Sequence, residues 1–255
     1  MQACRWLGLL VVAASPLAAQ APAYTAAELA CARYSESVQG TVHSAFGSVR
    51  RTETVGRSGR LTVRARRDSA GTVVEAWYDS LAVFRTGPEG RFAPSAEGIL
   101  GGRYVGVLDP DGEFLQSAAP FVPAALRDIF DFTRVFLHFF PPLPGRALAP
   151  SGEWGDGKGL SVRRLADSAV GGAPAERYAW TRHEAWDEAV SVGDSSVVVR
   201  RSEQEEGTLA WRPGAGPLGW ASAVASRVEF PGGAGRTEVT QQVSVRRLGG
   251  ACPGS

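Results

Sequence analysis

The sequence predicts a mainly β protein: a curved antiparallel sheet or open half-barrel with one amphipathic aromatic helix packed on or across it. Three observations lead to this fold class. Apolar and polar residues alternate over many short runs, glycine-rich turns separate the runs, and helical spacing dominates only one long segment. About 235 residues follow an N-terminal leader, which is enough for one large β domain.

The leader, residues 1–20, has the pattern of a signal peptide. A short basic start ending at Arg5 precedes an apolar core, Trp6–Ala14, that is too short to span a bilayer. Cys4 precedes that core, so it is in the wrong place for lipid attachment. We therefore expect a periplasmic or secreted protein that is soluble after signal-peptide cleavage and has no stable membrane span after processing. The alternative is an uncleaved membrane anchor.

The charge balance argues against a nucleic-acid partner. The 27 basic residues include Arg5, so the chain without its leader has as many basic as acidic residues, of which there are 26. A neutral chain has no net attraction for nucleic acid or for an anionic membrane surface.

Two cysteines remain after the leader, Cys31 and Cys252, close to the two ends of the chain. An even pair in an exported protein indicates a disulfide, and two free thiols are the alternative. Two cysteines without a nearby histidine provide too few ligands for a metal ion, so we expect none.

The predicted organisation is a single β-rich domain with short terminal segments. Residues 21–36 form an N-terminal segment with a short helix, and residues 251–255 form a tail. The domain, residues 37–250, divides into four parts: a first strand series (37–119), a helix (120–140), a proline-rich crossover (141–157) and a second strand series (158–250).

The first strand series shows the clearest alternation over Arg60–Arg66, where Leu61, Val63 and Ala65 share one face. Asp109–Gly112 is a strong hairpin turn. It joins two expected strands, Tyr104–Leu108 and Phe114–Leu115. The runs expected in the second series are Leu160–Leu165, Ala175–Arg182, Ser196–Arg201, Gly207–Arg212, Trp220–Phe230 and Arg236–Leu248.

Two helices are expected. Val122–Phe140 repeats its apolar residues at mixed three- and four-residue intervals, begins near Pro123 and ends before Pro141. A shorter helix over Thr25–Arg33 would be capped by Thr25, with Glu28 three residues further on.

The long aromatic helix would bury its apolar face against the sheet, after which Trp154 would re-enter the core. The simplest interpretation is plain hydrophobic core; the functional one is a helix that covers an apolar cavity of more than ~300 Å³. The candidate ligand-binding residues are Val135, Phe136, Phe139 and Phe140, with Trp77 or Trp180 opposite.

No catalytic, metal or cofactor site is predicted. His183-Glu184 lacks the second histidine of a zinc-protease motif, and His138 fits a satisfied histidine at the core boundary. The six acidic residues of the second series are expected at strand ends and turns, as a solvated rim: Glu184, Asp187, Glu188, Glu203, Glu205 and Glu206.

The middle of the chain, "FPPLPGRALAPSGEW", resembles a family of exported bacterial β-rich proteins of unknown function. The residues that match the pattern of that family are Phe140, Pro142, Leu143, Pro144, Leu148, Gly152 and Trp154. The similarity extends over most of the chain after the leader. The nearest fold analogy is the LolA/LolB-like lipoprotein-carrier half-barrel, in which a curved antiparallel sheet wraps around helices and shelters acyl chains.

Together these observations favour an exported, non-catalytic protein that binds or carries a hydrophobic ligand such as a lipid or acyl chain. The alternative is a structural or protein-interaction module of the cell envelope with a filled core and an envelope protein as partner.

Overall fold

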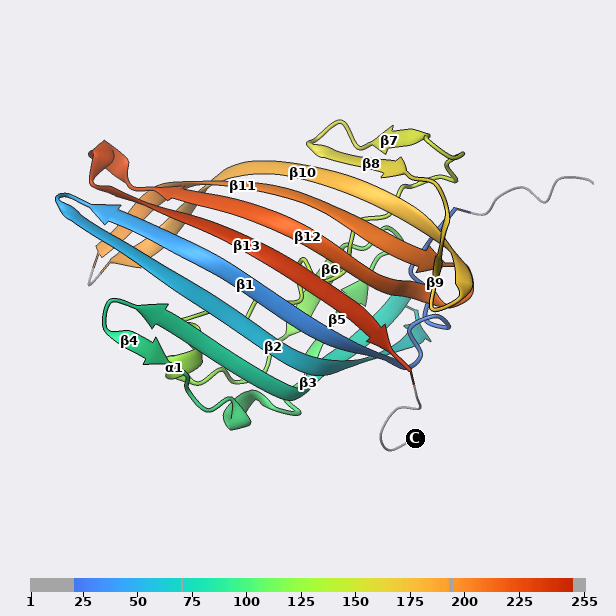
Figure 1. Ribbon diagram of the computed structural model, residues 1–255, viewed down its shortest axis with the longest axis horizontal. Coiled ribbons are helices and arrows are strands. Elements are labelled where there is room, and N and C mark those ends of the chain that lie inside the picture. Colours follow the sequence, from blue (N-terminus) through green and yellow to red (C-terminus); the bar gives the residue numbers. More distant parts are fainter. Residues whose placement is uncertain (1–20, 70, 193–194, 250–255) are drawn as a thin grey trace, which may run out of the picture.

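The computed structural model describes residues 21–69, 71–192 and 195–249. They form one antiparallel sheet of 13 strands (Figure 1). The predicted signal peptide, Cys252 and the tail 251–255 lie outside the described residues. No helix in the described part of the chain is long and apolar enough to cross a membrane.

The first strand series contains the predicted strands, but it begins at Ala32 and several of its strands are longer than expected. It contains β1 (Ala32–Phe46), β2 (Val49–Asp68), β3 (Gly71–Gly87), β4 (Gly90–Phe92), β5 (Tyr104–Leu108) and β6 (Phe114–Ala118). The Asp109–Gly112 turn is confirmed, with the Gly112 N–H donating to the Asp109 carbonyl over 3.0 Å. A 3₁₀ turn, η1 (Glu97–Ile99), lies between β4 and β5.

The second series has longer strands than predicted. It contains β7 (Glu153–Gly155), β8 (Leu160–Arg164), β9 (Ser168–Val170), β10 (Ala173–Val192), β11 (Ser195–Arg212), β12 (Gly216–Glu229), η2 (Pro231–Gly233) and β13 (Gly235–Leu248). Two of the predicted strands merge into β11, because the acidic residues between them pair along their whole length with β10.

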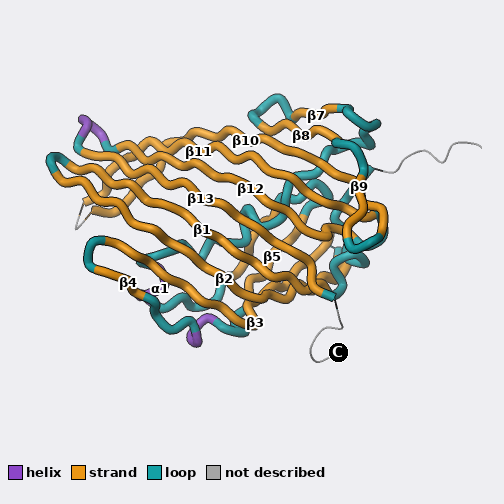
Figure 2. Tube along the Cα trace, in the orientation of Figure 1, coloured by secondary structure: helices purple, strands orange, loops and turns teal. Residues whose placement is uncertain are grey.

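The sheet curves into a half-barrel that does not close (Figure 2). The strand order is β6-β5-β3-β2-β1-β13-β12-β11-β10-β8-β7, so β6 and β7 are the two ends of this path. The first and last long strands pair at its centre, from Arg33 opposite Leu248 to Phe46 opposite Gly235. The predicted fold class is therefore confirmed in its main feature, the open curved sheet.

This topology determines the path of the middle of the chain. Because β6 and β7 lie at opposite ends of the sheet, residues 119–152 must run from one end to the other. We call them the crossing segment. All of its phenylalanines except Phe121 belong to the core on the concave side of the sheet, so the chain fills part of its own half-barrel.

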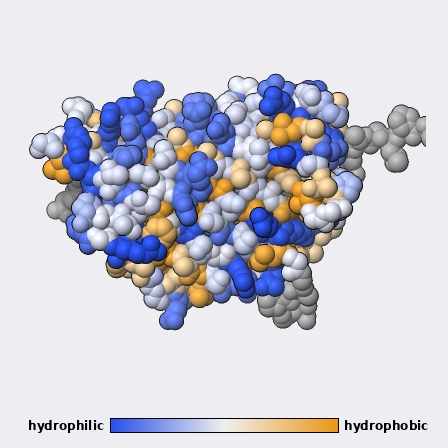
Figure 3. All heavy atoms as spheres, in the orientation of Figure 1, coloured by the Kyte–Doolittle hydropathy of each residue, from blue (hydrophilic) through white to orange (hydrophobic). Residues whose placement is uncertain are grey.

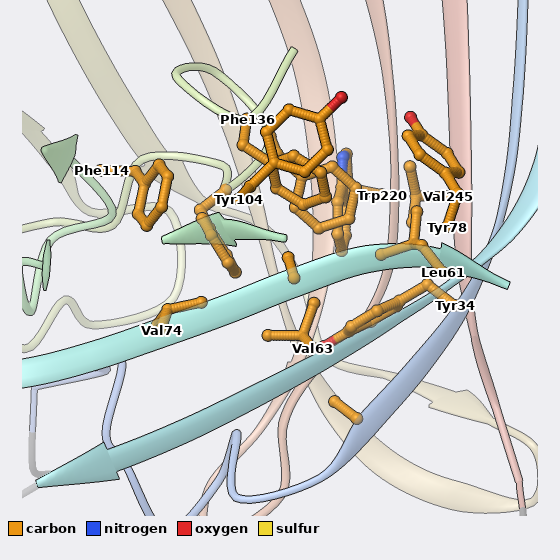
Figure 4. Packing of buried hydrophobic residues seen from close by; sticks show 14 of the residues in the cluster. Tyr34, Leu61, Val63, Val74, Tyr78, Tyr104, Phe114, Phe136, Trp220 and Val245 are labelled. Atoms are coloured by element: carbon orange, nitrogen blue, oxygen red, sulfur yellow. The ribbon is translucent and has the colours of Figure 1, made fainter. Parts of the chain in front are cut away.

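The concave face carries the core. Leu61, Val63 and Val74 project from β2 and β3 into the cluster that contains Tyr104 and Phe136 (Figure 4). A register shift between Arg60 and Leu61 leaves Asp79 unpaired in β3, and such bulges increase strand twist. Hydrophilic residues cover much of the face seen in Figure 3, with smaller hydrophobic areas between them.

The long aromatic helix is a wrong prediction. Only α1 (Ala124–Arg127) is helical, and the chain continues to Phe140 through successive turns. The interior of a curved sheet surrounds the segment on several sides, whereas a helix would present only one apolar stripe. Turns allow Phe132, Phe136 and Phe140, all almost completely buried, to pack against different strands.

The predicted short N-terminal helix is absent. Residues 26–31 form turns, and β1 already begins at Ala32. The predicted cap is nevertheless present: the Glu28 N–H donates to the Thr25 hydroxyl oxygen over 3.3 Å, and that hydroxyl donates to Glu28 Oε2 over 3.1 Å.

Candidate ligand-binding site

The crossing segment is held inside the half-barrel by hydrogen bonds from β5, from β6 and from the segment that precedes β1. The Tyr104 hydroxyl donates to the Phe132 carbonyl over 2.8 Å, and Gln116 Nε2 donates to the Thr133 carbonyl over 2.8 Å. Near the prolines, the Tyr24 hydroxyl donates to the Pro141 carbonyl over 2.9 Å. These hydrogen bonds hold the segment in the interior of the half-barrel.

Aromatic contacts add to this anchoring. The ring centroids of Phe136 and Tyr104 lie 4.6 Å apart, and those of Phe139 and Trp220 lie 4.9 Å apart at 80°. The Phe139–Trp220 pair is edge-to-face, and such a pair contributes about 0.5–1.5 kcal/mol beyond the burial of its area. The predicted aromatic interior is therefore present, although the helix is not.

Two hollows border the crossing segment. The larger, with a volume of about 710 Å³, lies between its residues 134–142, the β6 end of the sheet and the β7–β10 end. The smaller, of about 190 Å³, lies between residues 134–139 and the concave faces of β1, β2 and β11–β13. Arg134 and His138 line both, so the two hollows adjoin.

The larger hollow combines apolar walls with charged groups. Its apolar side chains are Phe114, Leu115, Leu137, Pro142, Trp154, Leu160 and Trp186. Trp154 is only partly buried, so the expectation that it re-enters the core is met only at the core margin. Lys158, Arg182 and Glu184 are among the charged residues. Such a surface suits a molecule with both apolar and polar parts.

A buried ion pair forms one wall of the smaller cavity. Arg57 Nη2 lies 2.8 Å from Glu36 Oε1 and Arg57 Nε donates to Glu36 Oε2 over 3.1 Å, while the Tyr78 hydroxyl donates to the same Oε2 over 2.8 Å. Burial alone would lower the pKa of Arg57, but the Glu36 carboxylate raises it overall. Burial, followed by the Glu36 charge, raises the pKa of the Tyr78 hydroxyl. Arg57 is therefore ionised and Tyr78 is neutral at pH 7.

A second polar chain connects the two hollows. Arg182 Nη1 lies 2.8 Å from His138 Nδ1 and 3.6 Å from Glu205 Oε2. Partial removal of water around the ring, followed by the Arg182 charge, lowers the pKa of His138. The imidazole is therefore neutral at pH 7, and its Nδ1 accepts the hydrogen bond from Arg182.

The structure brings two of the predicted ligand-binding residues to a cavity. Val135 and Phe139 line the smaller cavity. Phe136 and Phe140 are instead enclosed in the core, 0% and 2% exposed, beside Tyr104 and Tyr24 respectively.

The two predicted tryptophans lie on different faces. Trp180 belongs to the buried core cluster, with its ring directly over Gly207 of the neighbouring strand. Trp77 alternates with the core residues Ala76 and Tyr78, so it faces away from them, with the Arg103 guanidinium carbon 3.4 Å from its ring centroid. Neither Trp77 nor Trp180 lines either of the two hollows.

The acidic residues of the second series were misplaced by sequence reasoning. Glu184, Glu203 and Glu205 lie in the middle of β10 and β11, and Glu205 is only 8% exposed. The useful signal was their spacing, because Glu203 and Glu205 alternate and so share one face of a strand. Glu36 and Arg57 gave no such signal, since their pairing joins distant parts of the sequence.

Comparisons with known proteins agree with this architecture at the level of the fold. No protein-family model and no curated protein sequence matches the chain. A lipovitellin structure described as showing lipid–protein interactions superposes with a TM-score of 0.50 at 8% identity, covering 88% of this chain and 26% of that chain. The chain thus spans about a quarter of the length of that protein.

Two further solved structures match with much lower scores. A DUF1329 family protein from Desulfovibrio piger has a TM-score of 0.16 at 11% identity, covering 87% of each chain. Ail of Yersinia pestis, in complex with the heparin analogue sucrose octasulfate, has a TM-score of 0.18 at 8% identity, covering 85% of this chain and 99% of Ail. TM-scores this low do not support a common fold. The lipovitellin likeness agrees with the expected open, β-rich architecture, and it does so for the fold alone.

Proposed function

We propose that this protein is an exported, non-catalytic binding or carrier protein for an amphipathic small molecule such as a lipid. The observation that carries the proposal is the pair of adjoining hollows beside the crossing segment, of about 710 and 190 Å³, with aromatic and aliphatic walls and a few charged groups. Cavities of this size that combine apolar walls with a small polar set are typical of ligand sites.

The lipovitellin likeness supports the proposal in a limited way. It shows that a similar open sheet occurs in a protein described for its interactions with lipid. A fold accommodates many functions, so the weight remains with the hollows themselves. Export rests on the apolar leader and the pair of cysteines in the sequence.

The first test is native mass spectrometry of the protein, expressed with its leader in a bacterial host and purified without detergent, followed by solvent extraction. We expect added mass that extracts as an apolar or amphipathic compound. A mass without ligand, together with no binding of a fluorescent fatty-acid probe, would contradict the proposal.

A matched pair of variants locates the binding. Trp186→Ala removes a ring from the larger hollow, whereas Phe92→Ala removes an exposed ring from β4, which lines neither hollow. Removing an aromatic contact from a ligand site costs about 1–2 kcal/mol, so Trp186→Ala should weaken probe binding about tenfold. Equal weakening by both variants would place the ligand elsewhere.

One observation favours a second candidate, a protein-interaction module. Leu115 on the terminal strand β6 is 54% exposed, and Phe121, just beyond that strand, is 77% exposed. An apolar strand at the end of a sheet can accept a strand from another protein. Cross-linking of Leu115→Cys to an envelope protein, with no ligand in the mass spectrum, would favour this alternative.

A further inference from the structure

The long strand β10 is paired along only part of its outer edge. On that side it meets β9 at Ala173–Ala175 and β8 at Tyr178–Arg182, so β8 lies beside only one end of β10 (Figure 1). The remaining stretch, residues 184–192, pairs with β11 on its inner side alone within the described part of the chain. We call this stretch the free edge. It is longer than the terminal strands β6 and β7, which have five and three residues.

Alternation along the strand identifies the backbone groups that the free edge presents. The His183 N–H donates to the Gly159 carbonyl over 3.0 Å, so His183 directs its backbone groups towards the β8 side. In an antiparallel ladder every second residue shares that direction, and therefore Ala185, Asp187 and Ala189 direct their N–H and C=O groups outwards. All three residues are exposed. Among the described residues, none forms a hydrogen bond with these outward groups.

A row of unpaired donors and acceptors is the surface to which an extended polypeptide adds as a further strand. Proteins commonly block a long edge with proline, lysine or a β-bulge. The free edge, "EAWDEAVSV", contains no proline and no lysine, and its pairing with β11 shows no register shift. Small side chains at Ala185 and Ala189 flank Asp187 on the exposed face, which leaves room for a neighbouring strand.

The charges of the free edge determine which kind of strand it accepts. It carries Glu184, Asp187 and Glu188 and no basic residue. Glu184 and Glu188 have arginine partners at 3.8 and 2.9 Å. Asp187 forms no ion pair within the residues that the structure describes, although Arg200 is its cross-strand partner on β11. A strand with a basic residue opposite Asp187 would therefore gain the attraction of an opposite-charge cross-strand pair.

A second copy of the chain is a poorer partner than a basic strand. Pairing of two free edges about a two-fold axis at their middle would set Asp187 or Glu188 opposite its own counterpart, depending on the register. Like charges directly opposite each other destabilise a sheet. The charge pattern therefore favours a different, basic polypeptide.

We propose that the free edge of β10 binds an extended, basic segment of a partner protein as an additional antiparallel strand. Ala185, Asp187 and Ala189 would form the backbone hydrogen bonds, and a lysine or arginine of the partner would lie opposite Asp187. Trp186, half-buried on the concave side, would contact an apolar side chain of the added strand. The inference goes beyond the proposed carrier function, because it requires no ligand in either hollow.

Fluorescence anisotropy with a labelled peptide of alternating lysine and valine tests the inference, since this peptide has one basic and one apolar face as a strand. We expect it to bind the full protein and to slow hydrogen exchange at the amides of Ala185, Asp187 and Ala189. Replacing its lysines by glutamate should abolish binding. Methylating the backbone nitrogens of its lysines should weaken binding at least about tenfold, because the hydrogen bonds to the edge are lost.

Two variants of the protein locate the binding. Ala185→Pro removes an outward N–H and leaves the pairing with β11 in place, so it should weaken peptide binding about tenfold. Asp187→Asn keeps the backbone unchanged, which preserves the test if the proline lowers stability, and should weaken binding about threefold. Asp128→Asn, at an exposed aspartate just after α1, is the matched control and should change no binding constant.

Several results would overturn the inference. These are no binding of the lysine peptide, equal binding of its methylated form, or binding without protection of the three amides. A dimer of the protein that Ala185→Pro converts to a monomer would show that a second copy occupies the edge instead. The fatty-acid probe should bind the Asp187→Asn variant as it binds the original protein, so a failure of the carrier function is seen separately.

Discussion

At the scale of single residues, Glu203 lies directly opposite Glu184 in the sheet. Its ionised carboxylate should therefore lower the stability of the fold by an amount that depends on pH. Its pKa is raised above the usual value of 4.5, so the folded chain holds that proton more tightly than the unfolded chain does. Stability from this group is present at low pH and is lost as pH rises through the folded pKa. The charged groups around it are Glu205 and Arg201 on β11, Glu184 and Arg182 on β10, and Arg134 on the crossing segment.

Glu203→Gln should therefore raise the melting temperature at pH 7 and leave it unchanged near pH 4, where both folded and unfolded carboxyls are largely protonated. The measurement is thermal unfolding across that pH range, with Glu206→Gln as the control. A Glu203→Gln variant that is less stable at pH 7 would show that the carboxylate has a stabilising partner.

Removing one member of the buried Glu36–Arg57 ion pair should destabilise the protein, whereas Glu203→Gln should stabilise it. The Glu36 side chain is 1% exposed and that of Arg57 is 12% exposed, so Arg57→Leu leaves a charge in the interior. We expect a loss of about 3–5 kcal/mol in the free energy of unfolding, measured by urea denaturation. Arg67→Leu, an exposed arginine on the same strand, should change it by less than about 0.5 kcal/mol. A comparable loss in both would refute a specific role of the pair.

At the scale of elements, the crossing segment and the Asp109–Gly112 turn support each other. The Leu143 N–H donates to the Asp111 carbonyl over 2.7 Å, and Gly112 lies against Pro141. The proline run is buried here, which explains why a stiff stretch follows the aromatic one: it carries the chain past this turn with few N–H groups that need partners.

Gly112→Ala should be costly for two reasons that a control separates. Gly112 has φ +104°, and a Cβ there would lie 2.7 Å from the Pro141 carbonyl oxygen. Gly90 has φ +100° with nothing within 4 Å, so Gly90→Ala measures the backbone strain alone, about 1 kcal/mol. Urea denaturation should show a loss of about 2–3 kcal/mol for Gly112→Ala. Equal losses for the two variants would mean that the crossing segment shifts to accommodate the added Cβ at little cost in free energy.

At the scale of the whole molecule, the pairing of β1 with β13 holds the two halves in one sheet. Arg33 opposite Leu248 places the end of β13 close to Cys31. This arrangement is compatible with the predicted Cys31–Cys252 disulfide, which stays a prediction because Cys252 lies outside the described residues.

We expect the oxidised protein to be two hydrogens lighter than the reduced chain. Cys252→Ser should lower the free energy of unfolding by up to about 5 kcal/mol in the chain-entropy model, since the closed loop is long. Mass spectrometry and urea denaturation check the two parts. If Cys252→Ser and the original protein unfold at the same urea concentration with and without reductant, the disulfide is absent.

The local pattern was enough to place most strands. The strand Tyr104–Leu108 has the predicted bounds, with Tyr104, Gly106 and Leu108 buried and the two valines between them half-buried. The turn at Asp109–Gly112 followed from residue types alone. Val135 and Phe139 were predicted as cavity residues from the apolar face of the expected helix. They line the smaller cavity although the helix is absent, because a strongly apolar stretch is buried whatever its backbone conformation.

The sequence by itself determined the open β-sheet, its turns and the burial of the aromatic middle, because alternation and turn chemistry are local. The tertiary structure decided which distant strands meet, and therefore the central β1–β13 pair, the Glu36–Arg57 wall and the position of Glu203 opposite Glu184. It also replaced the expected helix by turns. The physical reason is the same in each case: pairing and enclosure depend on neighbours far away in the chain, and burial on several sides outweighs local helical spacing.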